Sequence, residues 1–180
     1  MKRIAFATLP LLILAACGHQ QDPVSSQTGV EVFTTTIVPT EGNSAQGVVN
    51  FRRTGDGIAV SANIEGLEAN AQHGFHIHQY GDCTAPDGSS AGGHFNPTGE
   101  RHGSRHDEER HAGDLGNLES NADGIATLEY IDERLTMDGA NSILGRGMVV
   151  HAQADDYETQ PTGDAGGRIG CGVIGVAERN

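Results

Sequence analysis

An alternation of apolar and polar residues constrains the fold of this chain of 180 residues more than any other feature. The clearest run follows a Gly55-Asp56-Gly57 turn and places four apolar side chains on one face of an extended strand: Ile58, Val60, Ala62 and Ile64. Further strands are predicted at residues 30–38, 46–53, 74–79, 125–131, 144–152 and 169–177. No amphipathic helix of useful length interrupts them, so the pattern predicts an all-β fold.

The length and composition fit one β-rich domain. The chain is long enough for a single hydrophobic core, and its 26 glycines are scattered rather than periodic, as in a domain with many turns. Two long segments, 81–115 and 155–167, carry no strand pattern. Loops of this length in a compact domain are usually functional or disordered, and the first contains half of the histidines considered next.

Six histidines and one aspartate are concentrated in three short stretches, at residues 74–78, 93–114 and 149–151. Imidazole and carboxylate groups suit divalent copper and zinc. His76 and His78 are two residues apart on a predicted strand, so both rings leave the same face and can bind one ion. His151, at the end of another strand, offers a third nitrogen. For any one of these residues alone, a buried, hydrogen-bonded histidine is the simpler alternative.

A second group of donors lies within the longer of these two segments: His94, His102, His111 and Asp114. Three nitrogens and one carboxylate are enough for a tetrahedral zinc ion. A surface loop with scattered polar residues is the alternative that spacing alone leaves open.

The N-terminal segment predicts export. Lys2 and Arg3 precede an apolar run over residues 4–16, shorter than the roughly 20 residues that span a bilayer, which is typical of a signal peptide. Leu14-Ala15-Ala16-Cys17 resembles the bacterial lipoprotein processing box, in which the cysteine becomes lipidated; an ordinary cleaved signal is the alternative. We therefore expect a signal peptide at 1–16, a lipid-anchored flexible tether at 17–29 and the functional domain at 30–180, in the bacterial periplasm.

Lipidation of Cys17 would leave Cys83 and Cys171 as the remaining cysteines. A bridge between them in an oxidising compartment would stabilise the fold by about 4 kcal/mol in the chain-entropy model. Two soft metal ligands are the alternative.

The net charge is strongly negative. The formal value of −13 becomes −15 when Lys2 and Arg3 are removed with the signal peptide. So acidic a protein is expected to repel nucleic acid and anionic lipid, and an anionic substrate would need local positive charge.

Four long motifs follow one another along the chain: Gly74-Phe75-His76-Ile77-His78, Gly93-His94-Phe95-Asn96-Pro97, Asp107-Glu108-Glu109-Arg110-His111-Ala112-Gly113-Asp114-Leu115-Gly116 and Gly166-Gly167-Arg168-Ile169-Gly170-Cys171-Gly172-Val173-Ile174-Gly175. Together they resemble the copper/zinc superoxide dismutase family, and the resemblance runs from about Val30 to Ala177. A chance match of this length and order is very improbable.

The resemblance implies two metal sites that share one histidine. Copper would be bound by His76, His78, His94 and His151, and zinc by His94, His102, His111 and Asp114. It also implies that Asp155 hydrogen-bonds one histidine of each site, that Arg168 attracts an anion beside copper, and that Thr162 lies at the channel rim. His94 and Arg168 would be the catalytic residues, whereas His106 matches no ligand.

The implied fold is a Greek-key β-barrel or sandwich of about eight antiparallel strands with two long functional loops; this family is a standard example of the sandwich architecture. The implied function is dismutation of superoxide to O₂ and hydrogen peroxide by copper that cycles between Cu(II) and Cu(I), with a histidine-bridged structural zinc, as antioxidant defence in the cell envelope. Superoxide is then the substrate. A homodimer is compatible with the resemblance, which does not indicate the interface.

The sequence departs from the family pattern in two respects. The early position of Cys83 looks bacterial, whereas the stretch 107–116 and the tail 172–177 look eukaryotic. The segment 152–167 has no lysine or arginine, although family members often carry lysines around the channel. Arg168 is therefore the obvious attractor, and Arg101, Arg105 or Arg110 would add to it if the histidine loop folded toward the channel.

Three other interpretations use the same residues. A protein that buffers copper or zinc without turnover explains the histidines but neither Arg168 nor Asp155. A copper-only dismutase is opposed by the joint presence of His102, His111 and Asp114. An adhesive β-sandwich with incidental histidines is opposed by the complete donor set.

Overall fold

The computed structural model describes residues 32–177. The predicted signal peptide, the predicted lipidation site at Cys17 and the predicted tether lie outside the described residues. No helix formed by residues 32–177 has the length and apolar character needed to cross a membrane.

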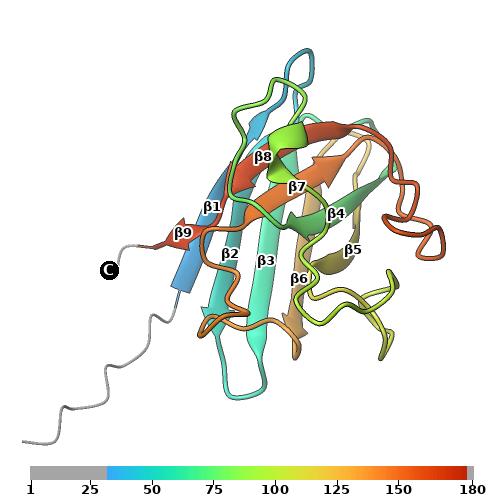
Figure 1. Ribbon diagram of the computed structural model, residues 1–180. Helices are drawn as coiled ribbons and strands as arrows, with labels where there is room; N and C mark the ends of the chain where they lie inside the picture. Colours follow the sequence, from blue (N-terminus) through green and yellow to red (C-terminus); the bar gives the residue numbers. More distant parts are fainter. Residues whose placement is uncertain (1–31, 178–180) are drawn as a thin grey trace, which may run out of the picture.

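The described part of the chain contains nine antiparallel strands and one short 3-10 helix, joined by turns and loops (Figure 1). The strands are β1 (Val32–Pro39), β2 (Gln46–Arg53), β3 (Ile58–Glu65), β4 (Gln72–His78), β5 (Asp114–Glu119), β6 (Ala126–Asp132), β7 (Gly147–His151), β8 (Arg168–Val173) and β9 (Gly175–Val176), and the helix η1 covers Ser89–Ala91. The two long loops expected from the sequence precede β5 and β8, and Figure 1 shows both beside β4 and β7.

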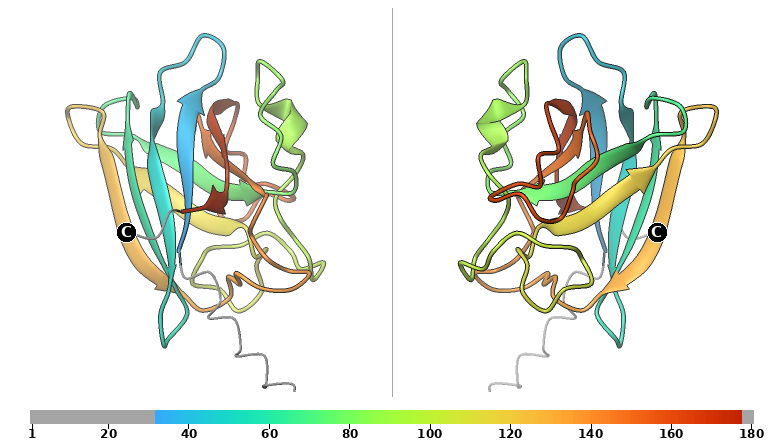
Figure 2. Two further views of the ribbon diagram at one scale, coloured as in Figure 1. Left: turned by 90° about the vertical axis from the view of Figure 1, so that its left-hand side faces the viewer. Right: turned by 90° about the vertical axis from the view of Figure 1, so that its right-hand side faces the viewer.

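The strands form one sheet that curls into a nearly closed barrel. Their order is β5-β4-β7-β8-β1-β2-β3-β6, with β9 paired to β1. The two end strands, β5 and β6, are consecutive in the chain, and a bridge between Ser120 and Ala126 lies at the turn that joins them (Figure 2). Consecutive strands β3 and β4 are not neighbours, nor are β6 and β7, which is a Greek-key connection. The predicted all-β, Greek-key fold is therefore confirmed.

The alternating apolar residues of the strands form the core of the barrel, as the sequence predicts. On β3, Ile58, Val60, Ala62 and Ile64 are buried, and the residues between them are partly or fully exposed. Neighbouring strands add the fully buried Phe33 and Phe51. Burial of each large apolar side chain stabilises the fold by about 1.5–3 kcal/mol, so β1, β2 and β3 form a stable part of the barrel to which β4 and β7 belong.

β5 is the strand that the sequence does not predict. Leu115 and Leu118 are both buried on it although they are three residues apart. Gly116 between them has a φ of +86°, and the register of β5 against β4 shifts between Gly74 and His76. A bulge of this kind breaks the period of two, which removes the pattern by which a strand is recognised. The predicted strand at 169–177 is also divided, into β8 and β9.

Candidate metal centre

The barrel brings four predicted copper ligands together. His76 and His78 lie on β4, His151 ends the adjacent strand β7, and His94 pairs with His78 as an isolated bridge. One ring nitrogen from each of the four lies within 4.8 Å of the others, and all four residues are buried. The Nε2 atoms of His78 and His151 are 3.3 Å apart. Residues 73 positions apart thus meet because their strands are neighbours.

The four predicted zinc ligands form a second buried group that converges on one oxygen atom. The Nδ1 atoms of His94, His102 and His111 lie 2.8, 3.0 and 3.2 Å from Asp114 Oδ1. The other oxygen, Oδ2, accepts hydrogen bonds from the backbone N–H groups of Gly103 and His111. The backbone therefore fixes the carboxylate while the rings gather on its free side.

These contacts do not form an ordinary hydrogen-bond network. One carboxylate oxygen faces three ring nitrogens, and the Nδ1 atoms of His94 and His111 lie only 3.4 Å apart. His102 Nδ1, although 3.0 Å from Asp114 Oδ1, lacks hydrogen-bond geometry and is buried without a partner, as are His76 Nδ1 and His94 Nε2. An unpaired buried polar atom costs about 1–3 kcal/mol. Lone pairs that converge in this way fit a cation, so the residues fit the implied copper and zinc.

His94 is the residue common to both groups. Its Nδ1 faces Asp114, and its Nε2 is the unpartnered atom on the opposite side of the ring. The centre of its ring lies 4.0 Å from that of His76 in one group and 5.3 Å from that of His102 in the other. One imidazole thus offers a separate nitrogen to each metal position.

The site keeps the ring nitrogens available for metal. Burial, followed by the neighbouring histidines, holds the pKa of His78 and of His151 well below the ordinary value. Burial and the nearby His76 likewise lower the pKa of His94 to about 4, despite the hydrogen bond to Asp114. A neutral imidazole has a free lone pair, which is the form that binds copper and zinc.

The carboxylates of the site stay ionised. Burial opposes ionisation of Asp114, but the close contact with His102 and the hydrogen bonds with His111 and His94 hold its pKa well below the ordinary range. Burial disfavours the charged form of His102, yet the close contact with Asp114 and the hydrogen bond to Asp155 raise its pKa to about 9.

Asp155 connects the two groups. Its Oδ2 lies 2.8 Å from Nε2 of His76, and its Oδ1 lies 2.9 Å from Nε2 of His102. By accepting a hydrogen bond from each Nε2–H, the carboxylate fixes both tautomers and leaves each Nδ1 lone pair for a metal. The structure places Asp155 in the position that the resemblance implies.

Asp155→Asn is expected to weaken zinc binding by about 10–100-fold, because an amide offers one acceptor where the carboxylate offers two. Competition with a chromophoric chelator measures this affinity. Asp156→Asn is the matched control, since Asp156 is adjacent, exposed and of the same charge. Equal zinc affinity in the two variants would contradict the role assigned to Asp155.

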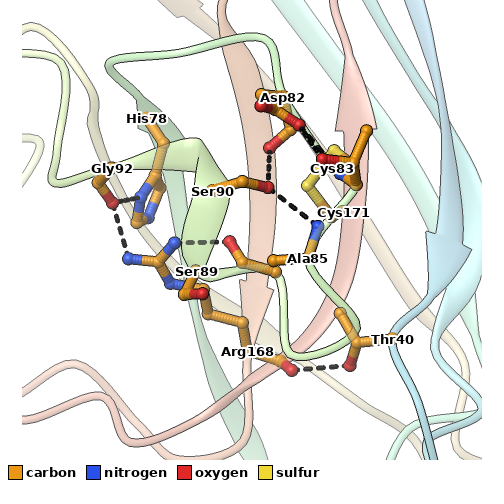
Figure 3. The surroundings of a disulfide bond; sticks show 12 residues. Thr40, His78, Asp82, Cys83, Ala85, Ser89, Ser90, Gly92, Arg168 and Cys171 are labelled. Carbon is orange, nitrogen blue, oxygen red and sulfur yellow. Dashed lines mark hydrogen bonds between the residues drawn. A yellow bond between two sulfur atoms is a disulfide. The ribbon is translucent and has the colours of Figure 1, made fainter.

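Arg168 lies beside the first histidine group (Figure 3). It is half-buried, and its two terminal nitrogens donate to the carbonyl oxygens of Gly88 and Gly92, each at 2.5 Å. The Gly92 carbonyl also accepts a hydrogen bond from His78 Nδ1 at 2.8 Å, so one oxygen atom separates the cation from a predicted copper ligand. Burial lowers the pKa of Arg168, but a guanidinium stays charged in proteins.

Thr162 is half-buried in the loop that carries Asp155. Among the hydrogen bonds of residues 32–177, none joins it to Arg168 or to either histidine group. The next residue, Gly163, packs against the site: its φ is +68°, and a Cβ there would lie 1.9 Å from Asp155 Oδ1. The loop can approach Asp155 this closely only with glycine at that position.

Arg110 has a different role from the one considered from the sequence. It is buried, pairs with Asp132 at 2.8 and 2.9 Å, and donates to the carbonyl oxygens of His111 and Asp114. It therefore fastens the histidine loop to β6 and does not guide substrate. Arg105 stacks on the Tyr130 ring at 4.7 Å, also beside β6. The sequence gives no signal for the Arg110–Asp132 pair, because both residues lie among ordinary charged neighbours.

Cys83 and Cys171 form a disulfide, with Cα atoms 5.8 Å apart. The predicted bridge is confirmed over the alternative of two metal ligands. The bond attaches the loop after β4 to β8, and the same loop presents the Gly88 and Gly92 carbonyls to Arg168 (Figure 3). The disulfide thus restrains the loop that positions the guanidinium.

Comparison with known proteins agrees with this geometry. Residues 45–174 match the family model described as copper/zinc superoxide dismutase. A protein of Onchocerca volvulus named superoxide dismutase [Cu-Zn] is 43% identical over 155 residues, which cover 79% of this chain and 96% of the relative. Superoxide dismutase [Cu-Zn] 5 of Dictyostelium discoideum is 42% identical over 147 residues, which cover 77% and 95%. With a matching barrel and two donor groups joined by one histidine, the chain belongs to the copper/zinc superoxide dismutase family.

Proposed function

We propose that this chain dismutates superoxide in the cell envelope, with copper held by the first histidine group and zinc by the second. Two superoxide anions and two protons give O₂ and hydrogen peroxide, so one anion is oxidised and the other is reduced. Copper supplies the one-electron couple Cu(II)/Cu(I) that this reaction requires, whereas zinc has a single oxidation state and supplies charge and structure. The observation that supports this proposal most strongly is that His94 belongs to both donor groups.

The residues of the site supply binding and proton transfer. Arg168 attracts the anion, since two carbonyl contacts leave several of its N–H donors free. His94 Nε2 can hold a proton while Nδ1 stays with the second group, and it can then give that proton to the reduced oxygen species. Asp155 and Asp114 hold the rings in place during these steps.

Metal analysis and a dismutation assay on one purified sample test the proposal. We expect one copper and one zinc per chain together with turnover. Bound metal without turnover would favour a buffering protein, copper without zinc would favour a copper-only enzyme, and neither metal would contradict the whole assignment. The convergence of His94, His102 and His111 on Asp114 supports a zinc-containing enzyme over a copper-only one.

The location in a bacterial envelope is supported by the Met1–Cys17 pattern alone, since the two relatives named above come from a nematode and from Dictyostelium. Mass spectrometry of the mature protein is expected to find residues 1–16 removed and Cys17 lipidated. An unmodified chain that begins after Cys17 would exclude the lipid anchor.

An exposed apolar surface supports a homodimer. Tyr80, Leu144 and Val173 are 53%, 44% and 45% exposed. The segments that carry these three residues are neighbours. Gly81 follows Tyr80, and a Cβ on Gly81 would lie 2.9 Å from Val173 Cγ1 and 2.2 Å from the carbonyl oxygen of Gly145, which follows Leu144. A cluster of large apolar side chains at a surface is typical of an interface, and self-association of one patch gives a twofold dimer.

Tyr80→Arg is expected to convert a dimer into a monomer, because it places a charge on the most exposed side chain of this patch. Sedimentation at several protein concentrations measures the mass. Val48→Arg is the matched control, since Val48 is 42% exposed on β2 outside the patch. A dimer that survives Tyr80→Arg, or a wild-type monomer, would contradict the proposed interface.

A further inference from the structure

Gln160 binds the backbone of His102 through two reciprocal hydrogen bonds. The His102 N–H donates to Gln160 Oε1 at 2.9 Å, and Gln160 Nε2 donates to the His102 carbonyl oxygen at 2.9 Å. The same Nε2 lies 3.2 Å from the Glu158 carbonyl oxygen, a contact within its own loop. A side-chain amide thus pairs with His102 as a neighbouring strand would.

His102 needs such support because it lies in a long loop outside the sheet. Its ring is hydrogen-bonded at Nε2 to Asp155, and its Nδ1 lies 3.0 Å from Asp114 Oδ1 without a hydrogen bond. Those contacts orient the imidazole but do not fix the main chain that carries it. Gln160 bonds both main-chain groups of His102 from a segment 58 positions away, and the N–H of the next residue, Gly103, adds a hydrogen bond to Asp114.

The loop that carries Gln160 is itself anchored to the barrel. Asn117, on β5, accepts from the Asp155 N–H at 2.8 Å and donates to the Asp155 carbonyl oxygen at 2.9 Å. Two side-chain amides therefore hold the two partners of one hydrogen bond: Asn117 fixes Asp155, and Gln160 fixes His102. Residues 155–160 carry both Asp155 and Gln160, so this short segment sets the distance between Asp155 and His102.

We infer that Gln160 is a positioning residue for His102 and sets how tightly the second group retains its metal, while the first group is unaffected. The inference rests on the proposed function, in which the second group binds zinc. Because His102 is held in place before the metal arrives, less conformational freedom is lost on binding. Among residues 32–177, the side chain of Gln160 hydrogen-bonds to the His102 and Glu158 backbone and to no ring of the first group.

Cobalt(II) is a suitable probe, because it prefers the same tetrahedral donors as zinc and absorbs visible light when so bound. Metal-free protein is titrated with cobalt(II) against a competing chelator. Gln160→Met keeps the side-chain length, removes both hydrogen bonds and is expected to weaken cobalt(II) binding about tenfold. Gln160→Glu keeps the acceptor, loses the donor and is expected to fall between wild type and Gln160→Met.

Gln72→Met is the matched control, since Gln72 is an exposed glutamine whose amide donates to Glu119 at 3.1 Å on β4 and β5. It is expected to bind cobalt(II) as wild type does, and copper(II) affinity is expected to change less than twofold in every variant. Wild-type cobalt(II) affinity in Gln160→Met, or an equal loss of copper(II) affinity, would overturn the inference. A wild-type protein without the tetrahedral cobalt(II) spectrum would instead overturn the proposed zinc site on which it rests.

Discussion

His94→Ala is expected to abolish copper binding, zinc binding and dismutase activity together. Each group loses one of its four donors in this variant, because Nδ1 belongs to one group and Nε2 is left for the other. Loss of a residue that only orients a ligand lowers metal affinity about 10–100-fold, so loss of the shared ligand should exceed that for both metals. Metal content after gel filtration and the dismutation rate are the two measurements.

Two further histidine variants make this test specific. His111→Ala is expected to lose zinc and keep copper, since His111 belongs only to the second group. His106→Ala is expected to keep both, because His106 is exposed and lies outside both groups. A His94→Ala protein that retained zinc with wild-type affinity would show that the ring does not serve both metals.

Arg168→Ala is expected to lower the bimolecular rate constant for superoxide by about 10–100-fold, because local positive charge in a cleft raises association rates by this order. Arg168 is the cation that shares the Gly92 carbonyl with His78. The loop before it carries Asp156, Glu158 and Asp164 instead of lysine. In the variant these carboxylates are no longer offset by Arg168, so its rate is expected to rise as added salt screens them.

Arg52→Ala is the control for this effect. It changes the net charge equally but lies on β2 and is exposed. Its rate and salt dependence are expected to resemble those of the wild type, and copper and zinc contents should be equal in all three proteins. If Arg168→Ala matched Arg52→Ala in both rate and salt dependence, guidance of the anion would come from elsewhere.

Much of the fold was predictable from local pattern. The alternation from Ile58 to Ile64 requires an extended strand with one buried face, and β3 has that form. β5 was not predictable in this way, because Gly116 and the shifted register place Leu115 and Leu118 inward at a spacing of three. The closed arrangement of the strands depends on contacts between distant segments, which periodicity does not encode.

The metal centre, like the fold, could be predicted from the sequence only in part. The metal-binding residue types and their spacing along the chain indicate two groups of donors. The residues that hold those donors were not indicated, because an asparagine, a glutamine or an arginine in a polar segment has the appearance of a solvated side chain. Asn117, Gln160 and Arg110 find their partners 38, 58 and 22 positions away, and only the fold brings them together.

A crystal structure of the protein loaded with both metals is the most direct test of the central claim that one imidazole serves two ions. We expect zinc on Nδ1 of His94, beside Asp114, and copper on Nε2 of the same ring. Two ions with separate histidine ligands, or a protein that binds no copper, would contradict the account.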